Sequence, residues 1–187
     1  DVEAHYNMGV VLEKQNRLEE AAAHYTEVLR IRPQDTDSHN NLGDIRNQQG
    51  KFDEALRHYT DVLRLRPSDT GLYNKIGTIL GHQGNPGEAA KYFSEAIRLQ
   101  PDNAEMHFNL GLALEQQGYF KDAIEKYSKA LQLNPDFEKA HYNLGIILAR
   151  HGDADGSVRH FSEMLRIDPD NEKAHYSLGV NFARQGK

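Results

Sequence analysis

The feature that most constrains this chain is a sequence period of 34 residues, which two sets of residues follow without an insertion. The glycines of this period are Gly9, Gly43, Gly77, Gly111, Gly145 and Gly179, and its prolines are Pro33, Pro67, Pro101, Pro135 and Pro169. A fixed period of this length predicts a stack of repeated units, each of which buries its apolar face against its neighbours and not in one central core.

Apolar residues within each period predict two amphipathic helices; Ile124, Tyr127 and Leu131, for example, follow helical spacing. Residues that tolerate the left-handed conformation separate the two helices at Asn16, Gly50, Gly84, Gly118, Gly152 and Gly186. We therefore predict helix–turn–helix units at 2–35, 36–69, 70–103, 104–137 and 138–171, and at 172–187 the first helix of a sixth unit or a capping helix. Repeat three carries Gly71, Gly81, Pro86 and Gly87, and we expect weaker packing there.

The repeated positions resemble those of the tetratricopeptide repeat family over essentially the whole chain. The family's Leu-Gly pair is present as Leu42-Gly43, Leu110-Gly111, Leu144-Gly145 and Leu178-Gly179. Its small residue at the helix crossing corresponds to Ala21, Ala55, Ala89, Ala123 and Ser157, and its aromatic residue to Tyr25, Tyr59, Phe93, Tyr127 and Phe161. The resemblance implies an all-α fold, a right-handed superhelical solenoid of antiparallel helix pairs, with a concave groove that is lined by the first helices and binds a peptide or protein.

Composition disfavours several kinds of partner. The formal net charge of −6 leaves no basic surface for a nucleic-acid backbone, and no apolar run is long enough for direct membrane insertion. The absence of cysteine leaves the redox compartment open, and we expect a soluble segment, in the cytoplasm rather than the periplasm. Because the sequence starts without methionine and stops where another helix is expected, we interpret it as part of a longer protein.

No catalytic constellation can be assembled from these residues. Paired carboxylates such as Glu19-Glu20 and Asp53-Glu54 stand at helix starts, where negative charge favours the helix dipole, and the singly spaced glycines form no phosphate-binding loop. Eight of the ten histidines share two repeat positions, and equivalent positions in stacked repeats are about 18–20 Å apart. We therefore interpret them as half-buried packing residues and expect no enzyme activity, cofactor or metal in this segment.

A column of asparagines is expected on the groove side of the first helices, at Asn7, Asn41, Asn109 and Asn143. Asparagine is a poor helix former, but it offers the paired donor and acceptor that a peptide main chain needs. The column resembles the asparagine ladder in the tetratricopeptide arm of O-linked N-acetylglucosamine transferases, which implies main-chain binding of an extended polypeptide. In the alternative interpretation these side chains only form hydrogen bonds to adjacent helices.

The groove is expected to become aromatic and basic toward the C-terminal repeats. Aromatic anchors beside basic residues suit a segment that carries apolar side chains and a carboxylate. The expected anchors and basic residues are Phe108, Tyr142, Tyr176, Lys139, Arg150 and Lys173. In the alternative interpretation the rings only pack across to the next repeat.

Three functions are compatible with this pattern. The first is a protein-interaction scaffold that binds a peptide or protein segment in its groove. The second is a non-catalytic, substrate-recruiting arm of a larger enzyme such as a glycosyltransferase. Self-association through the apolar ends of the array is a third possibility, because each end lacks a neighbour to cover it.

Overall fold

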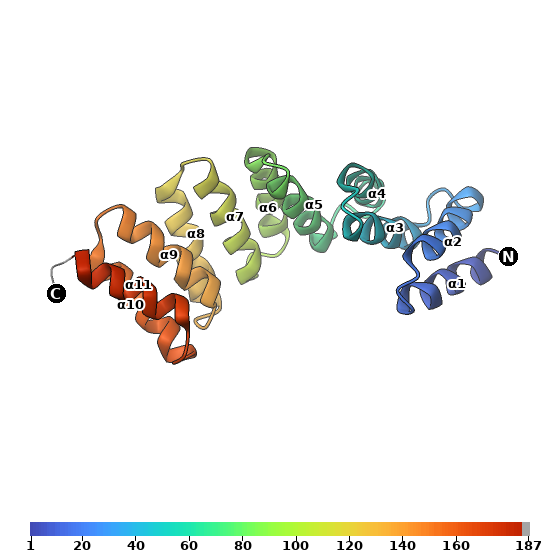
Figure 1. Cartoon of the computed structure of the whole chain (residues 1–187). Helices are drawn as coiled ribbons and strands as arrows, with labels where there is room; N and C mark the ends of the chain where they lie inside the picture. The colour runs from blue at the N-terminus through green and yellow to red at the C-terminus, as the bar shows by residue number, and fades with distance from the viewer. Residues whose placement is uncertain (185–187) are drawn as a thin grey trace. The chain divides into compact units, whose positions relative to one another are not determined.

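The computed structural model describes residues 1–184, and this range is built from α-helices without a β-strand (Figure 1). The helices are α1 Val2–Lys14, α2 Leu18–Ile31, α3 Thr36–Gln48, α4 Phe52–Leu65, α5 Thr70–His82, α6 Pro86–Leu99, α7 Ala104–Gln116, α8 Phe120–Leu133, α9 Glu138–Arg150, α10 Ala154–Ile167 and α11 Glu172–Arg184. Residues 185–187, which include Gly186 and the end of the predicted segment 172–187, lie outside the described range.

The chain forms two compact units, which we call unit 1 and unit 2. Unit 1 comprises Asp1–Ile79, and unit 2 begins at Leu80. The division falls within α5, in repeat three.

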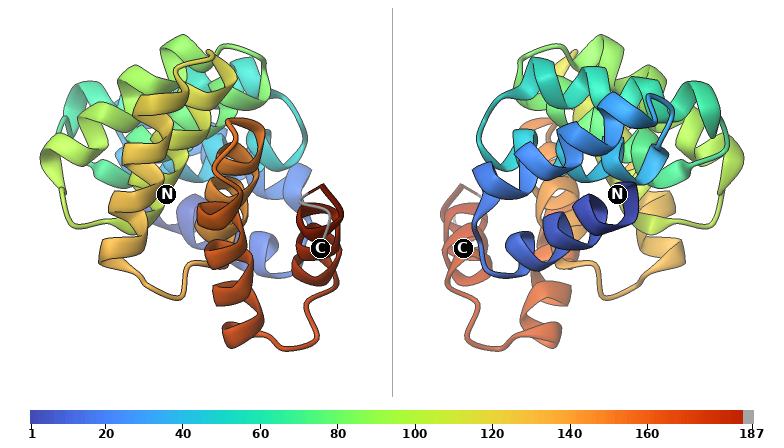
Figure 2. Two further views of the ribbon diagram at one scale, coloured as in Figure 1. Left: turned by 90° about the vertical axis from the view of Figure 1, so that its left-hand side faces the viewer. Right: turned by 90° about the vertical axis from the view of Figure 1, so that its right-hand side faces the viewer.

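Each unit is a succession of antiparallel helices in which a helix packs on the next one along the chain: α1 to α4 in unit 1, and α6 to α11 in unit 2. Figure 2 shows α10 and α11 side by side, joined by the turn at residues 168–171. The predicted all-α fold of antiparallel helix pairs is confirmed.

The turn within each helix pair depends on one residue in the left-handed conformation. Its φ is 59° at Asn16 and 72° at Gly50, and the later turns have Gly84, Gly118 and Gly152 in the same role. The N–H of the next residue then donates back to the first helix, as from Arg17 to the Leu12 carbonyl at 2.9 Å. These hydrogen bonds satisfy carbonyls that the helix end would otherwise leave without a partner.

Close contact between the helices of a pair explains the first glycine series. A Cβ added at Gly43 would lie 2.5 Å from Cε1 of Tyr59, and one added at Gly145 would lie 2.7 Å from Cε1 of Phe161. In these pairs, as at Gly9 and Gly111, the aromatic ring of the second helix occupies the space that a larger residue would need. Gly179 differs, because no atom lies within 4 Å of its added Cβ.

The buried residues repeat in the same way in both units. Unit 1 has a core cluster of Leu12, Ala21, Ala22, Tyr25, Leu42 and Ile45. Unit 2 has an equivalent cluster of Phe108, Ala123, Tyr127, Ala130, Ala140, Leu144 and Ile147. Each cluster joins one helix pair to the first helix of the next, as expected for a repeat stack. None of the helices described here combines the length and the apolar character that crossing a membrane requires.

Candidate functional site

Two successive first helices of unit 2, α9 and α11, carry the same set of exposed and half-buried side chains. In order along each helix these are a lysine, a tyrosine, a branched aliphatic residue and an arginine. Their spacing of three, four and four residues places them on one side of the helix. We call the set the α9–α11 surface; it consists of Lys139, Tyr142, Ile146 and Arg150 on α9, and Lys173, Tyr176, Val180 and Arg184 on α11.

A pocket of about 290 Å³ lies on this surface and extends from the two tyrosines to the two arginines. Tyr142, Ile146 and Val180 line it from the two first helices, and the Phe161 ring lines it from α10, with its centroid 6.2 Å from that of Tyr142. Tyr176 also lines the pocket, and 76% of its surface is exposed. An aromatic side chain this exposed beside an apolar pocket is available to a partner.

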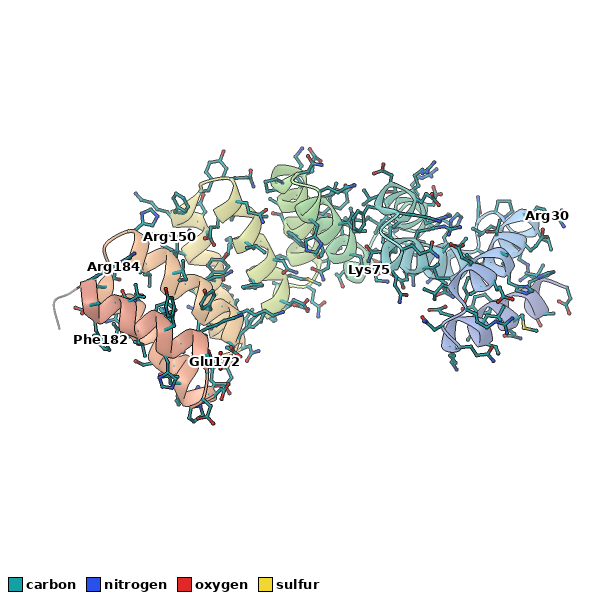
Figure 3. The ribbon with its side chains drawn as sticks, viewed as in Figure 1. Arg30, Lys75, Arg150, Glu172, Phe182 and Arg184 are labelled. Carbon is teal, nitrogen blue, oxygen red and sulfur yellow. The ribbon has the colours of Figure 1, made fainter. Side chains whose placement is uncertain are left out.

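Basic residues stand at both ends of the surface. Arg150 and Arg184 lie together at the C-terminal ends of α9 and α11, and both line the pocket (Figure 3). At the other end, the ammonium group of Lys173 lies 5.9 Å from the centroid of the Tyr142 ring, a cation–π distance. Lys139 occupies the equivalent position at the start of α9 and is exposed.

Phe108 is a correction to the predicted set, because the structure places it in the core of unit 2, where it is 8% exposed. Its ring centroid lies 5.6 Å from that of Tyr127 and 5.0 Å from that of Phe137. This residue therefore packs across to the next repeat, as the alternative interpretation has it, and offers no anchor to a partner.

Two of the predicted asparagines, Asn143 and Asn41, are hydrogen-bonded to tyrosine hydroxyls. Asn143 donates to the hydroxyl of Tyr127 at 3.3 Å, and Asn41 is hydrogen-bonded to the hydroxyl of Tyr25. Both bonds join the first helix of one pair to the second helix of the preceding pair. Of the other two, Asn7 is exposed on α1 and Asn109 is half-buried on α7. Asn41 and Asn143 thus match the interpretation in which asparagines connect adjacent helices.

Tyr25, Tyr127 and their equivalent Tyr59 each donate to a carboxylate. Tyr25 donates to Glu13 at 2.9 Å, Tyr59 to Asp44 at 2.6 Å, and Tyr127 to Glu115 at 2.7 Å. Burial, reinforced by the hydrogen bond to the carboxylate, raises the pKa of each tyrosine well above its ordinary value. We call this arrangement the acid–tyrosine link.

Lys75 replaces the asparagine that would follow Tyr59. Its ammonium group donates to both carboxylate oxygens of Asp44, at 2.6 and 2.8 Å, and lies 5.3 Å from the centroid of the Tyr59 ring. Lys75 therefore departs from the asparagine column for a structural reason, because its ammonium group compensates the negative charge of the Asp44 carboxylate.

Repeats three and five lack the acid–tyrosine link, since they have Phe93 and Phe161 in place of tyrosine. The two positions that supply the carboxylate elsewhere hold Ile146 and Ala149 in repeat five. In place of the carboxylate and the tyrosine hydroxyl of the other repeats, the apolar side chains of Ile146, Ala149 and Phe161 therefore line part of the pocket of the α9–α11 surface.

A polar contact lies beneath this pocket. The buried side chain of Asn181 on α11 donates to the hydroxyl of Ser157 on α10 at 3.0 Å. In the equivalent contacts of other repeats both residues are apolar, as with Ile45 and Ala21.

Sequence reasoning missed three histidine pairs. Within one repeat a histidine of the first helix faces a histidine of the second, with 3.0 Å between the two Nδ1 atoms in every pair: His5 and His24, His39 and His58, and His141 and His160. The prediction considered only distances between equivalent histidines of different repeats, and these contacts join two different positions of the same repeat. A constant separation of 19 residues between partners was the available signal.

In two of these pairs, a backbone carbonyl fixes the tautomer of the more buried histidine. Nε2 of His39 lies 3.0 Å from the Pro33 carbonyl and Nε2 of His141 lies 2.9 Å from the Pro135 carbonyl, so each must carry a proton and donate. Nδ1 is then an acceptor for the second histidine. Within residues 1–184, no three histidine, aspartate or glutamate side chains are grouped so that they could hold a metal ion.

Several solved structures are similar to this chain. The MamA protein has 26% sequence identity and a TM-score of 0.76 over 81% of this chain and 82% of its own. A form of MamA from Desulfovibrio magneticus RS-1 has 22% identity and a TM-score of 0.85 over 91% and 97%. YrrB, a TPR protein with an unusual peptide-binding site, has 22% identity and a TM-score of 0.81 over 95% and 91%. No curated protein matches in sequence.

Family models for the tetratricopeptide repeat match nearly the whole chain. One model matches residues 1–68, and another matches 40–97, 74–138 and 116–172. The helix pairs, the crossing glycines and the aromatic residues that cover them agree with these matches. The chain belongs to the tetratricopeptide repeat family.

Proposed function

We propose that this protein is an interaction scaffold that binds a segment of another protein on the α9–α11 surface, and that it acts by binding and not by catalysis. The observation that carries the proposal is the partly apolar pocket beside the exposed Tyr176. A well-packed aromatic anchor next to an apolar pocket is the usual centre of a protein interface. Membership of the family, and the peptide-binding site for which its relative YrrB is described, support the same function.

Within this proposal the predicted residues divide into two groups. Tyr142 and Tyr176 are the anchors, Arg150 lines the pocket, and Lys139 and Lys173 stand at the opposite end of the α9–α11 surface. Asn41 and Asn143 maintain the contacts between helix pairs, while Asn7 and Asn109 are secondary candidates for contact with a partner main chain. No observation favours the alternative of a recruiting arm of a glycosyltransferase.

A selection of peptides on the intact chain tests the proposal. Peptides of about twelve residues would be selected from a random displayed library, and their affinities measured by fluorescence anisotropy. We expect the double variant Tyr142→Ala, Tyr176→Ala to lose at least tenfold in affinity while keeping its helical circular dichroism.

The matched control is Tyr119→Ala, which removes a tyrosine that is 56% exposed in the turn between α7 and α8 and does not line this pocket. Its affinity should equal that of the unmodified protein. Equal binding by the double variant and the unmodified protein would show that the surface is assigned wrongly.

A further inference from the structure

The charges of the α9–α11 surface form a pattern that the other first helices lack. Its first position holds lysine in α9 and α11, but Glu3, Asp37 and Glu105 in α1, α3 and α7. Its last position holds Arg150 and Arg184. The surface therefore has two cations at each end of an apolar middle.

These four cations are poorly compensated within the protein. Lys139, Lys173 and Arg184 have no carboxylate within 4.0 Å among residues 1–184. Arg150 reaches Glu115 only at 3.8 Å, and 65% of its side chain is exposed. Lys75 of unit 1, in contrast, lies within 2.6 Å of Asp44. Cations without internal partners keep their attraction for an external anion.

The length of the surface sets the spacing that a partner needs. Lys139 and Arg150 are eleven residues apart on one helix, which corresponds to about 16 Å at the rise of an α-helix. An extended chain covers the same distance in about five residues. A partner that reaches both ends thus has anions about five residues apart, with the apolar pocket between them.

On these grounds, and resting on the proposed function, we infer that the partner is an acidic protein segment in which carboxylates flank an aromatic or aliphatic side chain. The apolar side chain enters the pocket between Tyr142, Phe161 and Tyr176. One carboxylate binds at the lysine end of the surface, to Lys139 or Lys173, and the other binds Arg150 and Arg184, which line the same pocket and whose planar guanidinium groups match a carboxylate.

A protein segment fits better than a nucleic acid, although both carry negative charge. Glu138 and Glu172 adjoin the two lysines in sequence and repel a continuous phosphate backbone, and the net charge of the chain is −6. A peptide places its charges only where the cations lie, and it can supply the apolar group that the pocket accepts.

The test uses labelled peptides and the intact chain, with binding followed by fluorescence anisotropy. The acidic probe is Asp-Asp-Gly-Phe-Leu-Gly-Asp-Asp, and matched probes have serine or lysine in place of every aspartate. An oligouridylate of eight nucleotides is the nucleic-acid probe. We expect the acidic probe to bind at least tenfold more tightly than the serine probe, and neither the lysine probe nor the RNA to bind.

Charge reversal connects the affinity to the named residues. The double variant Arg150→Glu, Arg184→Glu should lose at least tenfold in affinity for the acidic probe and gain affinity for the lysine probe. Lys14→Glu is the matched control, since Lys14 occupies the same repeat position on α1. The control should bind the acidic probe as the unmodified protein does.

The outcomes separate this inference from the proposed function. Equal binding of the serine and acidic probes, with loss of both in Tyr142→Ala, Tyr176→Ala, would leave the proposed function standing and overturn the acidic partner. Tight RNA binding would overturn it as well, and so would the absence of binding by every peptide. Loss of the acidic probe in the arginine variant, together with gain of the lysine probe, would support it.

Discussion

Unit 1 and unit 2 have the same kind of core but different surfaces on their first helices. In both, a glycine of the first helix meets an aromatic ring of the second, as Gly43 meets Tyr59 and Gly145 meets Phe161. In both complete pairs of unit 1, a tyrosine hydroxyl then holds a carboxylate on the first helix. At the C-terminal end of unit 2 the phenylalanine has no hydroxyl, and an apolar pocket takes the place of the carboxylate.

The difference indicates that the core and the proposed binding surface depend on separate features of the same ring. Ring size maintains the packing of the helix pair, whereas the hydroxyl decides whether an acidic residue can be held at the surface. A change between tyrosine and phenylalanine can therefore alter the chemistry offered to a partner without altering the fold.

The largest expected effect concerns the feature that both units share. Gly43→Ala and Gly145→Ala should each lower the free energy of unfolding by about 2–3 kcal/mol, because the new Cβ overlaps a buried ring. Unfolding in guanidinium chloride, followed by circular dichroism, measures the change. Gly179→Ala is the control and should be neutral or slightly stabilising, as its added Cβ meets no atom within 4 Å. If Gly43→Ala were as stable as this control, the common core would be described wrongly.

A smaller effect should come from exchanging the rings that distinguish the surfaces. Tyr127→Phe removes the partner of Glu115 and Asn143 and should cost about 1–2 kcal/mol. Phe161→Tyr introduces a hydroxyl into the pocket beside Ile146 and Ala149, which carry no carboxylate to accept its hydrogen bond, and it should lower both stability and peptide affinity.

Adding Ala149→Glu to Phe161→Tyr places a carboxylate at the position equivalent to Glu115. The double variant should recover the lost stability, because the new hydroxyl gains an acceptor, but it should not recover peptide affinity. Thermal unfolding and anisotropy report the two properties separately. Recovery of binding together with stability would mean that the missing carboxylate is not what opens the pocket.

The smallest effect should come from the histidine pairs, which occur in both units. Burial, followed by the charge of the partner histidine, lowers the pKa of His58 and of His160 below the ordinary value of 6.5. Below about pH 6.5 these two histidines therefore bind protons more readily in the unfolded chain than in the folded chain, so the free energy of unfolding falls as the pH drops. We expect the melting temperature to decrease by a few degrees between pH 7.5 and pH 5.5.

Other charged groups act on these two histidines and set the background for the experiment. Around His58 they are His39, Asp61, Arg46 and Arg57, and around His160 they are His141, Arg159, Glu163 and Asp153. The variant His58→Gln, His160→Gln keeps these neighbours and removes the titration, so its melting temperature should depend less on pH. An identical pH profile in the variant would assign the effect to other groups.

The helices could be predicted from the sequence because their boundaries depend on single residues with special backbone requirements. A left-handed turn needs glycine or asparagine, and a proline cannot continue a helix, so the bounds follow from residues such as Gly50 and Pro67. Helical spacing likewise predicted that Lys139, Tyr142 and Arg150 share one side of α9.

Other parts of the site could not be predicted, because they depend on contacts between non-equivalent positions. Phe108 is buried by Phe137, which stands where other repeats have an aspartate or asparagine before the first helix. The bond of Asn143 depends on a hydroxyl in the preceding repeat. A period compares each residue with its equivalents, so it does not reveal which different positions meet in space.

The buried contact between Asn181 and Ser157 bears on how nearly identical helices find their places in the stack. An amide at this position needs a hydrogen-bond partner, and the equivalent second-helix positions elsewhere are alanines: Ala21, Ala55, Ala89 and Ala123. Packing of α11 against any of those helices would remove the bond to the Ser157 hydroxyl and leave the amide only its bond to the Ser177 carbonyl of its own helix, at a cost of about 1 kcal/mol. During folding this polar pair therefore disfavours a wrong order of repeats. Apolar contacts cannot do so, because they are interchangeable between repeats.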